Sequence, residues 1–220
     1  MPLLALILAV LLGPATQPSL DARLEAIDAR TGQIEDLTAS FVQAKQSPLL
    51  RDPLVTRGIL KARPAAMLWD SQGQTPTRMS VDANLLRILY VDQNVLEEYP
   101  VRGNVAAMTA SPLPRLAALR ESFEIEGDAG AGLGAPEGGD TLALRLTPTN
   151  DEMLEHVDQV RVLLDAARGV VLVFEVTDPD GEVTTMRFAD IETNVGLTDA
   201  DLAMDAPADA KVVRPLGDGR

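Results

Sequence analysis

The stretch Gly58-Ile-Leu-Lys-Ala-Arg-Pro-Ala-Ala-Met-Leu-Trp-Asp70 holds the strongest structural signal in this sequence. Two arms that read as extended strands flank Pro64, which cannot donate a hydrogen bond to a sheet, so we expect a sheet edge or a corner there. Trp69 is the only tryptophan, and its large ring on the second strand can close one end of an apolar interior. Arg63, at the corner, could use its five donors to hold carbonyl groups of an overlying loop or helix. A surface arginine and a core tryptophan are the plainer interpretation.

Extended segments continue on both sides of this hairpin. Leu142, Leu144 and Leu146 alternate with less apolar neighbours, which is typical of a strand with one buried face. Asp178-Pro-Asp-Gly181 has the residues of a tight turn between two strands. The regular spacing predicts a mainly β fold with a curved antiparallel sheet, either a sandwich or a barrel. The expected strands include Leu54–Arg63, Ala66–Ser71, Arg78–Asp82, Leu85–Val91, Val95–Tyr99, Val170–Val176 and Val183–Ile191.

Other segments of the chain do not read simply as strands. A helix is expected after Ser19, a suitable N-cap, with an apolar stripe of Leu20, Leu24 and Ile27 and an end near Gly32. Helical spacing also marks Pro112–Phe123. The Gly- and Ala-rich segment Gly127–Asp140 is expected to be a mobile surface loop. Leu37–Lys45 fits either the tail of a helix or a strand.

Composition excludes several classes of function. The 220 residues include 33 acidic and 19 basic side chains, a net charge of −14, which argues against binding nucleic acid. Because there is no cysteine, disulfides, thiol catalysis and Cys-ligated metals are excluded. The length suggests one domain, and we expect a monomer.

The N-terminus reads as an export signal. Pro2–Gly13 is an uncharged apolar run, shorter than the about 20 residues that span a bilayer. Gly13 and Ala15 provide small residues for cleavage after Ala15. We therefore expect a signal peptide over residues 1–15, a single domain over 16–220, and export to a periplasm. A buried strand is the alternative interpretation of the run.

The search for catalytic or metal chemistry yields little. His156 is the only histidine, and one histidine beside carboxylates is a poor metal site. Asp178–Gly181 resembles the start of a calcium loop, but position 12 of that loop is Ala189 instead of glutamate. No Gly-x-Ser-x-Gly motif is present. We predict no catalytic residue, no metal and no cofactor, and an exported hydrolase using His156 remains the competing class.

The order of several motifs resembles the LolA family of periplasmic outer-membrane lipoprotein carriers. The residues that carry the resemblance are Phe41-Val-Gln43, the Gly58–Trp69 hairpin, Ser80–Tyr90, Phe188–Asn194 and Lys211-Val-Val213. The resemblance implies an unclosed antiparallel barrel, or half-barrel, whose helices form a lid over an apolar cavity. It also implies that acyl chains of lipoproteins are received from an inner-membrane ABC exporter and passed to an outer-membrane acceptor.

The resemblance assigns roles to individual residues. Arg63 matches the arginine that tethers the lid in the closed state. The residues expected to line the lipid cavity are Leu60, Met67, Leu68, Trp69, Met79, Val81, Ile88, Tyr90, Leu116, Leu119, Phe174, Met186 and Phe188. A glycolipid carrier or lipid sensor of the same fold remains open, and the sequence does not distinguish a cavity from a filled core.

Overall fold

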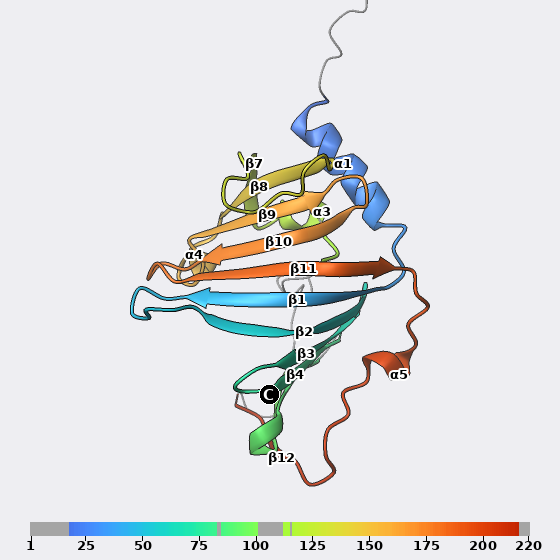
Figure 1. Cartoon of the computed structure of the whole chain (residues 1–220), viewed down its shortest axis with the longest axis vertical. Coiled ribbons are helices and arrows are strands. Elements are labelled where there is room, and N and C mark those ends of the chain that lie inside the picture. Colours follow the sequence, from blue (N-terminus) through green and yellow to red (C-terminus); the bar gives the residue numbers. More distant parts are fainter. Residues whose placement is uncertain (1–17, 83–84, 101–111, 115, 216–220) are drawn as a thin grey trace, which may run out of the picture.

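The computed structural model describes residues 18–82, 85–100, 112–114 and 116–215. Their strands form one open sheet in the order β12-β6-β5-β4-β3-β2-β1-β11-β10-β9-β8-β7 (Figure 1). The predicted curved antiparallel sheet is confirmed, and it is a single sheet that does not close. The strands are β1 Leu37–Gln46, β2 Leu54–Arg63, β3 Ala66–Gln72, β4 Thr77–Val81, β5 Leu85–Tyr90, β6 Val95–Pro100, β7 Phe123–Gly127, β8 Thr141–Pro148, β9 Gln159–Asp165, β10 Val170–Thr177, β11 Val183–Thr193 and β12 Lys211–Val213.

The sheet consists of two meanders joined side by side. One runs from β1 to β6 and the other from β7 to β11, and β11 then pairs with β1 from Leu37↔Thr193 to Gln46↔Val183. We call the two parts the β2–β6 half and the β7–β11 half. β12 adds to β6 in parallel, whereas the other paired strands of the described chain are antiparallel.

The hairpin that dominates the sequence signal forms as expected. β2 and β3 pair from Arg57↔Gln72 to Arg63↔Ala66, so Pro64 lies in the turn between them. Gly58 is required in β2, because a Cβ there would lie 2.7 Å from the Phe41 ring and closer still to the carbonyl oxygen of Asp70. Leu37–Lys45, which fitted two interpretations, lies in strand β1.

Helix α1 (Leu20–Thr31) confirms the prediction for the N-terminal helix. The Ser19 hydroxyl accepts a hydrogen bond from the Ala22 N–H at 3.3 Å, as an N-cap does. Leu24 and Ile27 are buried against the concave side of the sheet. No helix within the described ranges is long and apolar enough to span a membrane. The expected signal peptide, residues 1–15, lies outside the described residues.

The helix expected over Pro112–Phe123 is much shorter in the structure. Only α3 (Leu116–Leu119) is helical among the described residues of this segment, and Phe123 begins strand β7. The extended backbone of Phe123–Gly127 is paired with β8 from Phe123↔Pro148 to Gly127↔Leu144. This tertiary pairing outweighs the local helical spacing.

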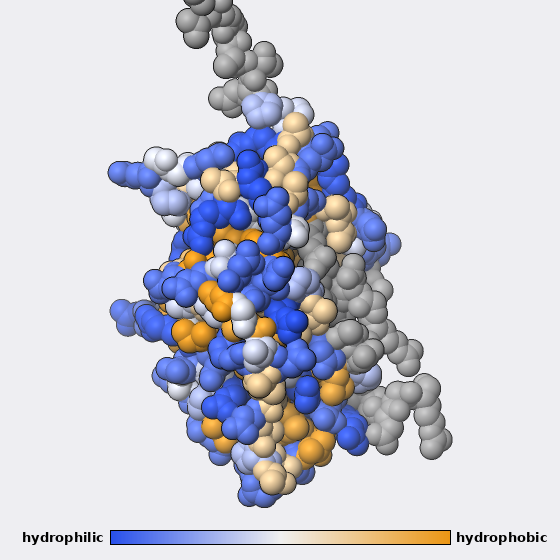
Figure 2. All heavy atoms as spheres, turned by 90° about the vertical axis from the view of Figure 1, so that its right-hand side faces the viewer, coloured by the Kyte–Doolittle hydropathy of each residue, from blue (hydrophilic) through white to orange (hydrophobic). Residues whose placement is uncertain are grey.

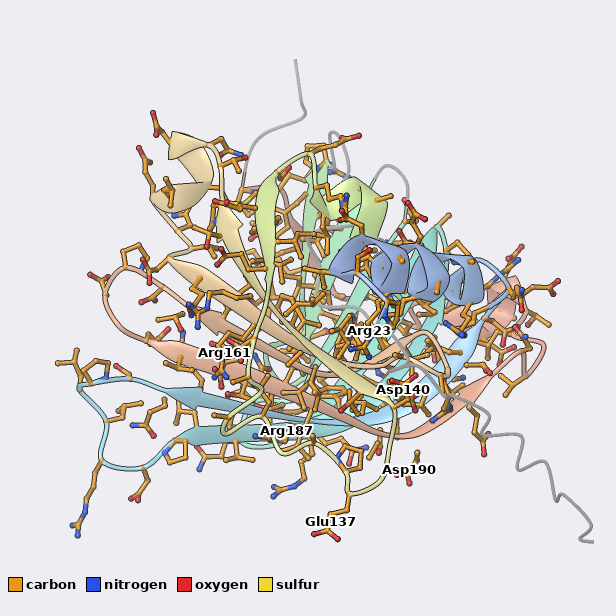
Figure 3. All side chains as sticks on the ribbon, turned by 90° about the horizontal axis from the view of Figure 1, so that it is seen from above. Arg23, Glu137, Asp140, Arg161, Arg187 and Asp190 are labelled. Carbon is orange, nitrogen blue, oxygen red and sulfur yellow. The ribbon has the colours of Figure 1, made fainter. Side chains whose placement is uncertain are left out.

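The prediction of a mobile surface loop over Gly127–Asp140 is wrong for its central part. Leu133 is fully buried and packs on Leu163 and Val173. Arg161 donates hydrogen bonds to Asp128 at 3.0 Å and to the Ala131 carbonyl at 2.8 Å, and Arg187 donates to the Leu133 carbonyl. Figure 3 shows this loop passing Arg161 and Arg187 before it returns to the sheet at Asp140.

This loop explains why β10 is apolar on both faces. Val171 belongs to the main core, whereas Val173 belongs to the small cluster beneath Leu133 on the outer face. A bulge between these two residues adjusts the register with β9. β9 and β10 are therefore covered on both faces.

The C-terminal segment runs along the β2–β6 half (Figure 1). It begins where the carboxylate of Asp36 accepts hydrogen bonds from the N–H groups of residues 195–197. Its short helix α5 (Asp199–Leu202) contacts β2 and β3. It ends in β12, beside β6. The remaining helical elements of the described ranges are α4 (Asp151–Leu154) and η1 (Val91–Gln93).

Candidate functional site

The concave face of the sheet carries a continuous apolar surface beneath α1 and α3. Trp69 lies at its centre and is 3% exposed. The Phe41 ring meets the indole edge-on, with centroids 4.9 Å apart, and Phe188 lies at 6.0 Å. Residues from both halves of the sheet thus meet at Trp69.

The structure brings most of the predicted lining residues together on this face. Seven belong to the buried core, and three more pack partly buried against it. The seven are Leu60, Met67, Trp69, Val81, Leu116, Met186 and Phe188, and the three are Met79, Leu119 and Phe174. Ile88 and Tyr90 are half-buried on β5, directly opposite Met79 and Thr77 of β4. These twelve residues therefore form one connected surface.

Leu68 is the exception. It stands between Met67 and Trp69 in β3, and successive side chains of a strand point to opposite faces. Its register partner Lys61 forms an ion pair with Asp201 of α5, at 3.6 Å, on the outer side of the sheet. Leu68 consequently faces the C-terminal segment and not the concave surface. Because Met67, Leu68 and Trp69 are all apolar, the sequence does not indicate which of them faces which side of the sheet.

Helices α1 and α3, which we call the lid, are joined by a contact that the sequence did not reveal. The carboxylate of Asp28, on α1, accepts hydrogen bonds from the N–H groups of Leu116 and Ala117 at 3.0 and 2.9 Å. It thereby caps the N-terminus of α3 from another helix. Arg120 adds an ion pair with Asp21 at 2.5 Å. Neither pairing has a local sequence signature, because the partners are far apart in the chain.

The lid is anchored to the β7–β11 half. The Thr31 hydroxyl donates a hydrogen bond of 2.7 Å to the Gly169 carbonyl, in the turn between β9 and β10. The Val171 N–H donates to the Pro112 carbonyl at 2.9 Å. Arg23 bonds Asp140 at 3.0 Å, and Figure 3 shows the two side chains facing one another. Together these contacts tie both ends of the lid to the same side.

A cleft opens where the lid meets the β2–β3 turn. Its volume is about 480 Å³, within the range of small-molecule sites. Asp28 and Thr31 are its polar groups, and most of its wall is apolar. The lining residues are Asp28, Thr31, Gly32, Ile34, Pro64, Leu113, Pro114, Ala117 and Ala118. Figure 2 views the molecule from this end and shows a mostly hydrophilic surface with small apolar patches.

Arg63 borders this cleft but bonds elsewhere. Its guanidinium forms an ion pair with Asp199 of α5 at 2.5 Å, and the Arg63 side chain is 39% exposed. Arg63 thus reaches the C-terminal segment, whereas the resemblance places its tether on the lid. Sequence reasoning did not identify Asp199 as the partner.

A polar group sits on the concave surface of β5 and β6. The hydroxyls of Tyr90 and Tyr99 both donate to the Glu97 carboxylate, at 3.3 and 2.7 Å. Burial and the adjacent Glu97 raise the pKa of Tyr90, and the hydrogen bond to Glu97 raises the pKa of Tyr99. The alternation of β6 could have indicated this carboxylate, because Glu97 lies opposite Ile88.

His156 lies apart from this site. It follows α4 and is exposed. Among the described residues, no three histidine, aspartate or glutamate side chains are grouped so that they could hold a metal ion.

Comparison with known proteins gives a fold and a family. A crystal structure of an uncharacterized conserved protein from Thermus thermophilus aligns with a TM-score of 0.57 at 13% identity, covering 90% of this chain and 99% of that one. A LolA superfamily protein from Nitrosomonas europaea gives 0.44 at 10% identity, covering 86% and 99%. The lipoprotein LppX from Mycobacterium tuberculosis gives 0.48 at 10% identity, covering 83% and 99%. A comparison with curated proteins found no match.

The family assignment comes from the sequence match. The model of the outer membrane lipoprotein carrier protein LolA matches residues 32–203, from just after α1 to just after α5. This range contains the β2–β3 hairpin, the concave surface and most of the cleft. Because the match spans more than half of the chain, and the open antiparallel sheet agrees with it, the chain belongs to the LolA family of outer membrane lipoprotein carrier proteins.

Proposed function

We propose that this chain is a soluble periplasmic carrier that binds the acyl chains of lipoproteins. It would receive them from an inner-membrane ABC-type exporter and deliver them toward an outer-membrane acceptor. The observation that carries the proposal is the apolar concave surface beneath α1 and α3, which has an apolar cleft at the Pro64 end. Membership of a lipoprotein carrier family supports the same conclusion.

The energetics favour a surface of this kind. Extracting an acyl chain from a bilayer costs about 0.8 kcal/mol per methylene, so a carrier must offer an apolar surface of similar extent. Methionines such as Met67, Met79 and Met186 provide flexible walls that adapt to chains of different shape. Half-buried Met79 and Ile88 can be covered by a guest, whereas Leu144 and Leu164 are already fully packed.

The roles of individual residues follow from their positions. Leu60, Met67, Trp69 and their neighbours on the concave face would line the lipid site, and Leu68 would not. Arg63 would act through the C-terminal segment, because Asp199 is its partner. We therefore propose that Arg63 affects the transfer of cargo at the edge of the cleft.

The proposal includes a compartment and excludes catalysis. Residues 1–15 would be removed as a signal peptide, leaving residues 16–220 as a monomer in the periplasm. No catalytic residue is proposed, since a carrier needs none. For the competing hydrolase, His156→Ala would have to abolish a measured turnover.

Lipid binding tests the proposal directly. Protein purified from a periplasmic extract should carry acylated species detectable by native mass spectrometry, and it should bind a fluorescent fatty acid. Ala118→Trp, which fills the cleft, should weaken that binding about tenfold or more, whereas Ala26→Trp on the exposed side of α1 should not. Absence of both acylated species and fatty-acid binding would refute the carrier function. The masses of any bound species would separate lipoprotein from glycolipid cargo.

A further inference from the structure

The centre of the concave surface contains a buried donor without an acceptor. The Nε1 atom of Trp69 is inaccessible to solvent and has no hydrogen-bond partner among the residues that the structure describes. Indole N–H can only donate. A buried donor that is left unpaired costs about 1–3 kcal/mol. The concave surface of the described chain thus contains an unsatisfied hydrogen-bond donor at its centre.

The described surroundings of Trp69 offer the N–H no acceptor. Its aromatic neighbours are Phe41 and Phe188, and its partners across the adjacent strands are Leu60 and Met79. An ordered water is a poor solution here, because buried waters need about 2–4 polar partners. Within the described ranges the Ser80 hydroxyl is also buried without a partner, but it alternates with Met79 and Val81 and so faces the other side of the sheet.

The position of Trp69 relates it to the cleft. The cleft lies at the Pro64 turn, and Met67 is the first concave residue of β3 beyond that turn. Trp69 follows two residues later, about 7 Å farther along the strand. A guest that enters beneath the lid would pass Ala62 and Met67 before it reaches the indole.

We propose that the Trp69 N–H donates a hydrogen bond to an ester carbonyl of the bound acyl group. This inference rests on the proposed carrier function. Hydrocarbon chains contain no acceptor, and the ester carbonyls are the first oxygens encountered along a diacylglyceryl group. The chemical class recognised would therefore be diacyl esters, in preference to ether lipids with the same chains.

The hydrogen bond would also bias the protein toward the loaded state. Only a ligand that interacts differently with two states shifts the balance between them. Before loading, the described residues leave the indole N–H unpaired, and in the loaded state the carbonyl would satisfy it. Cargo uptake would thus satisfy the unpaired indole N–H in addition to burying apolar area.

The test exploits the single tryptophan. Replacing tryptophan by β-(benzothiophen-3-yl)alanine exchanges the N–H for sulfur at position 69 alone, since the chain has one Trp. The probes are dipalmitoylglycerol and its ether counterpart dihexadecylglycerol. The natural protein should bind the ester about tenfold more tightly, equivalent to about 1.4 kcal/mol. The analogue protein should retain its affinity for the ether and lose the preference.

Controls separate the possible failures. Ser80→Ala removes the buried hydroxyl on the other side of the sheet, away from the concave surface, and should keep the ester preference. Equal binding of ester and ether by the natural protein, or a preference that survives in the analogue, overturns the hydrogen bond but not the carrier function. Binding of neither lipid by the natural protein overturns both.

A second measurement covers an analogue that does not fold. In the natural protein, the indole N–H band in ultraviolet resonance Raman spectra should shift when the ester lipid is added. The ether lipid should leave the band in place. An identical band with both lipids would also overturn the proposal.

Discussion

The two halves of the sheet both consist of antiparallel strands, but they differ in how completely their apolar side chains are buried. In the β7–β11 half, Leu144, Leu146 and Leu164 are fully buried on the concave side, and the loop around Leu133 covers β9 and β10 on the outer side. In the β2–β6 half, Met79 and Ile88 remain half-buried on the concave side. The lid is anchored to the first of these halves and meets the second at an open cleft. We therefore expect Leu144 and its buried neighbours to contribute more to stability, and Met79 and Ile88 to contribute more to the proposed binding of a guest.

Core truncation should show the largest difference between the halves. Leu144→Ala removes a fully buried side chain and should lower the free energy of unfolding by about 3 kcal/mol. Met79→Ala, in the open half, should cost about 1 kcal/mol or less because its side chain is only partly buried. Urea unfolding measures both changes. Equal losses would contradict the division into two halves.

The same pair should behave in the opposite way toward lipid. Met79→Ala should weaken binding of a fluorescent fatty acid more than Leu144→Ala does, once both are measured where they are fully folded. A larger binding defect in Leu144→Ala would show that the guest contacts the β7–β11 half instead of the β2–β6 half.

Acid should weaken the covered half through Asp128. The hydrogen bond from Arg161 lowers the pKa of this carboxyl to about 2. Since the unfolded value is about 3.9, the resulting stability is present above about pH 4 and is lost as the pH falls through about 2. Asp128→Asn should remove about 2 kcal/mol of this pH dependence. Urea unfolding between about pH 5 and pH 2 measures it, and parallel curves for the two proteins would show that Asp128 is not responsible.

The joint between the lid helices should have a moderate effect. Asp28→Ala removes the cap of α3, for which losses are about 1 kcal/mol. Hydrogen exchange should accelerate at the Leu116 and Ala117 amides, which donate to Asp28. Asp21→Ala, which removes only the ion pair with Arg120, should leave those two amides protected. Unchanged exchange in Asp28→Ala would mean that the two helices are held by apolar contacts alone.

Arg63 should have the smallest effect on stability. Its partner Asp199 is 99% exposed, and exposed ion pairs contribute about 0–1 kcal/mol. Arg63→Leu should therefore leave the urea midpoint almost unchanged and alter the kinetics of acyl transfer to acceptor vesicles. Asp199→Asn should reproduce the kinetic change if the C-terminal segment mediates it. Transfer kinetics identical to those of the natural protein would remove Arg63 from the handover mechanism.

Much of the sheet was predictable because local patterns agreed with the tertiary structure. The alternation at Leu142–Leu146 and the turn at Asp178–Gly181 correspond to observed elements, and Gly181 adopts a φ of 79° in that turn. The resemblance also led to the correct family. Pattern and fold diverge at Phe123, where a helical spacing ends in a strand, because pairing with β8 is a long-range interaction.

The candidate site was less predictable, for two physical reasons. Apolar residues such as Leu68 look the same whichever face they occupy, so composition does not reveal the side of the sheet. Contacts such as Asp28 with α3, or Arg63 with Asp199, join residues that are 88 and 136 positions apart. The prediction of a mobile loop over Gly127–Asp140 was wrong for the same reason, because Arg161 and Arg187 hold this loop from distant strands.

The junction between β1 and β11 has a consequence for how the molecule is made. Leu37 pairs with Thr193, so the central strands of the sheet come from opposite ends of the described chain. The β1–β6 meander can begin to pair early in synthesis, but its β1 edge stays exposed until β11 is available. Long-range pairing of this kind folds slowly. The architecture thus delays completion of the sheet until strand β11, near the end of the described chain, is available.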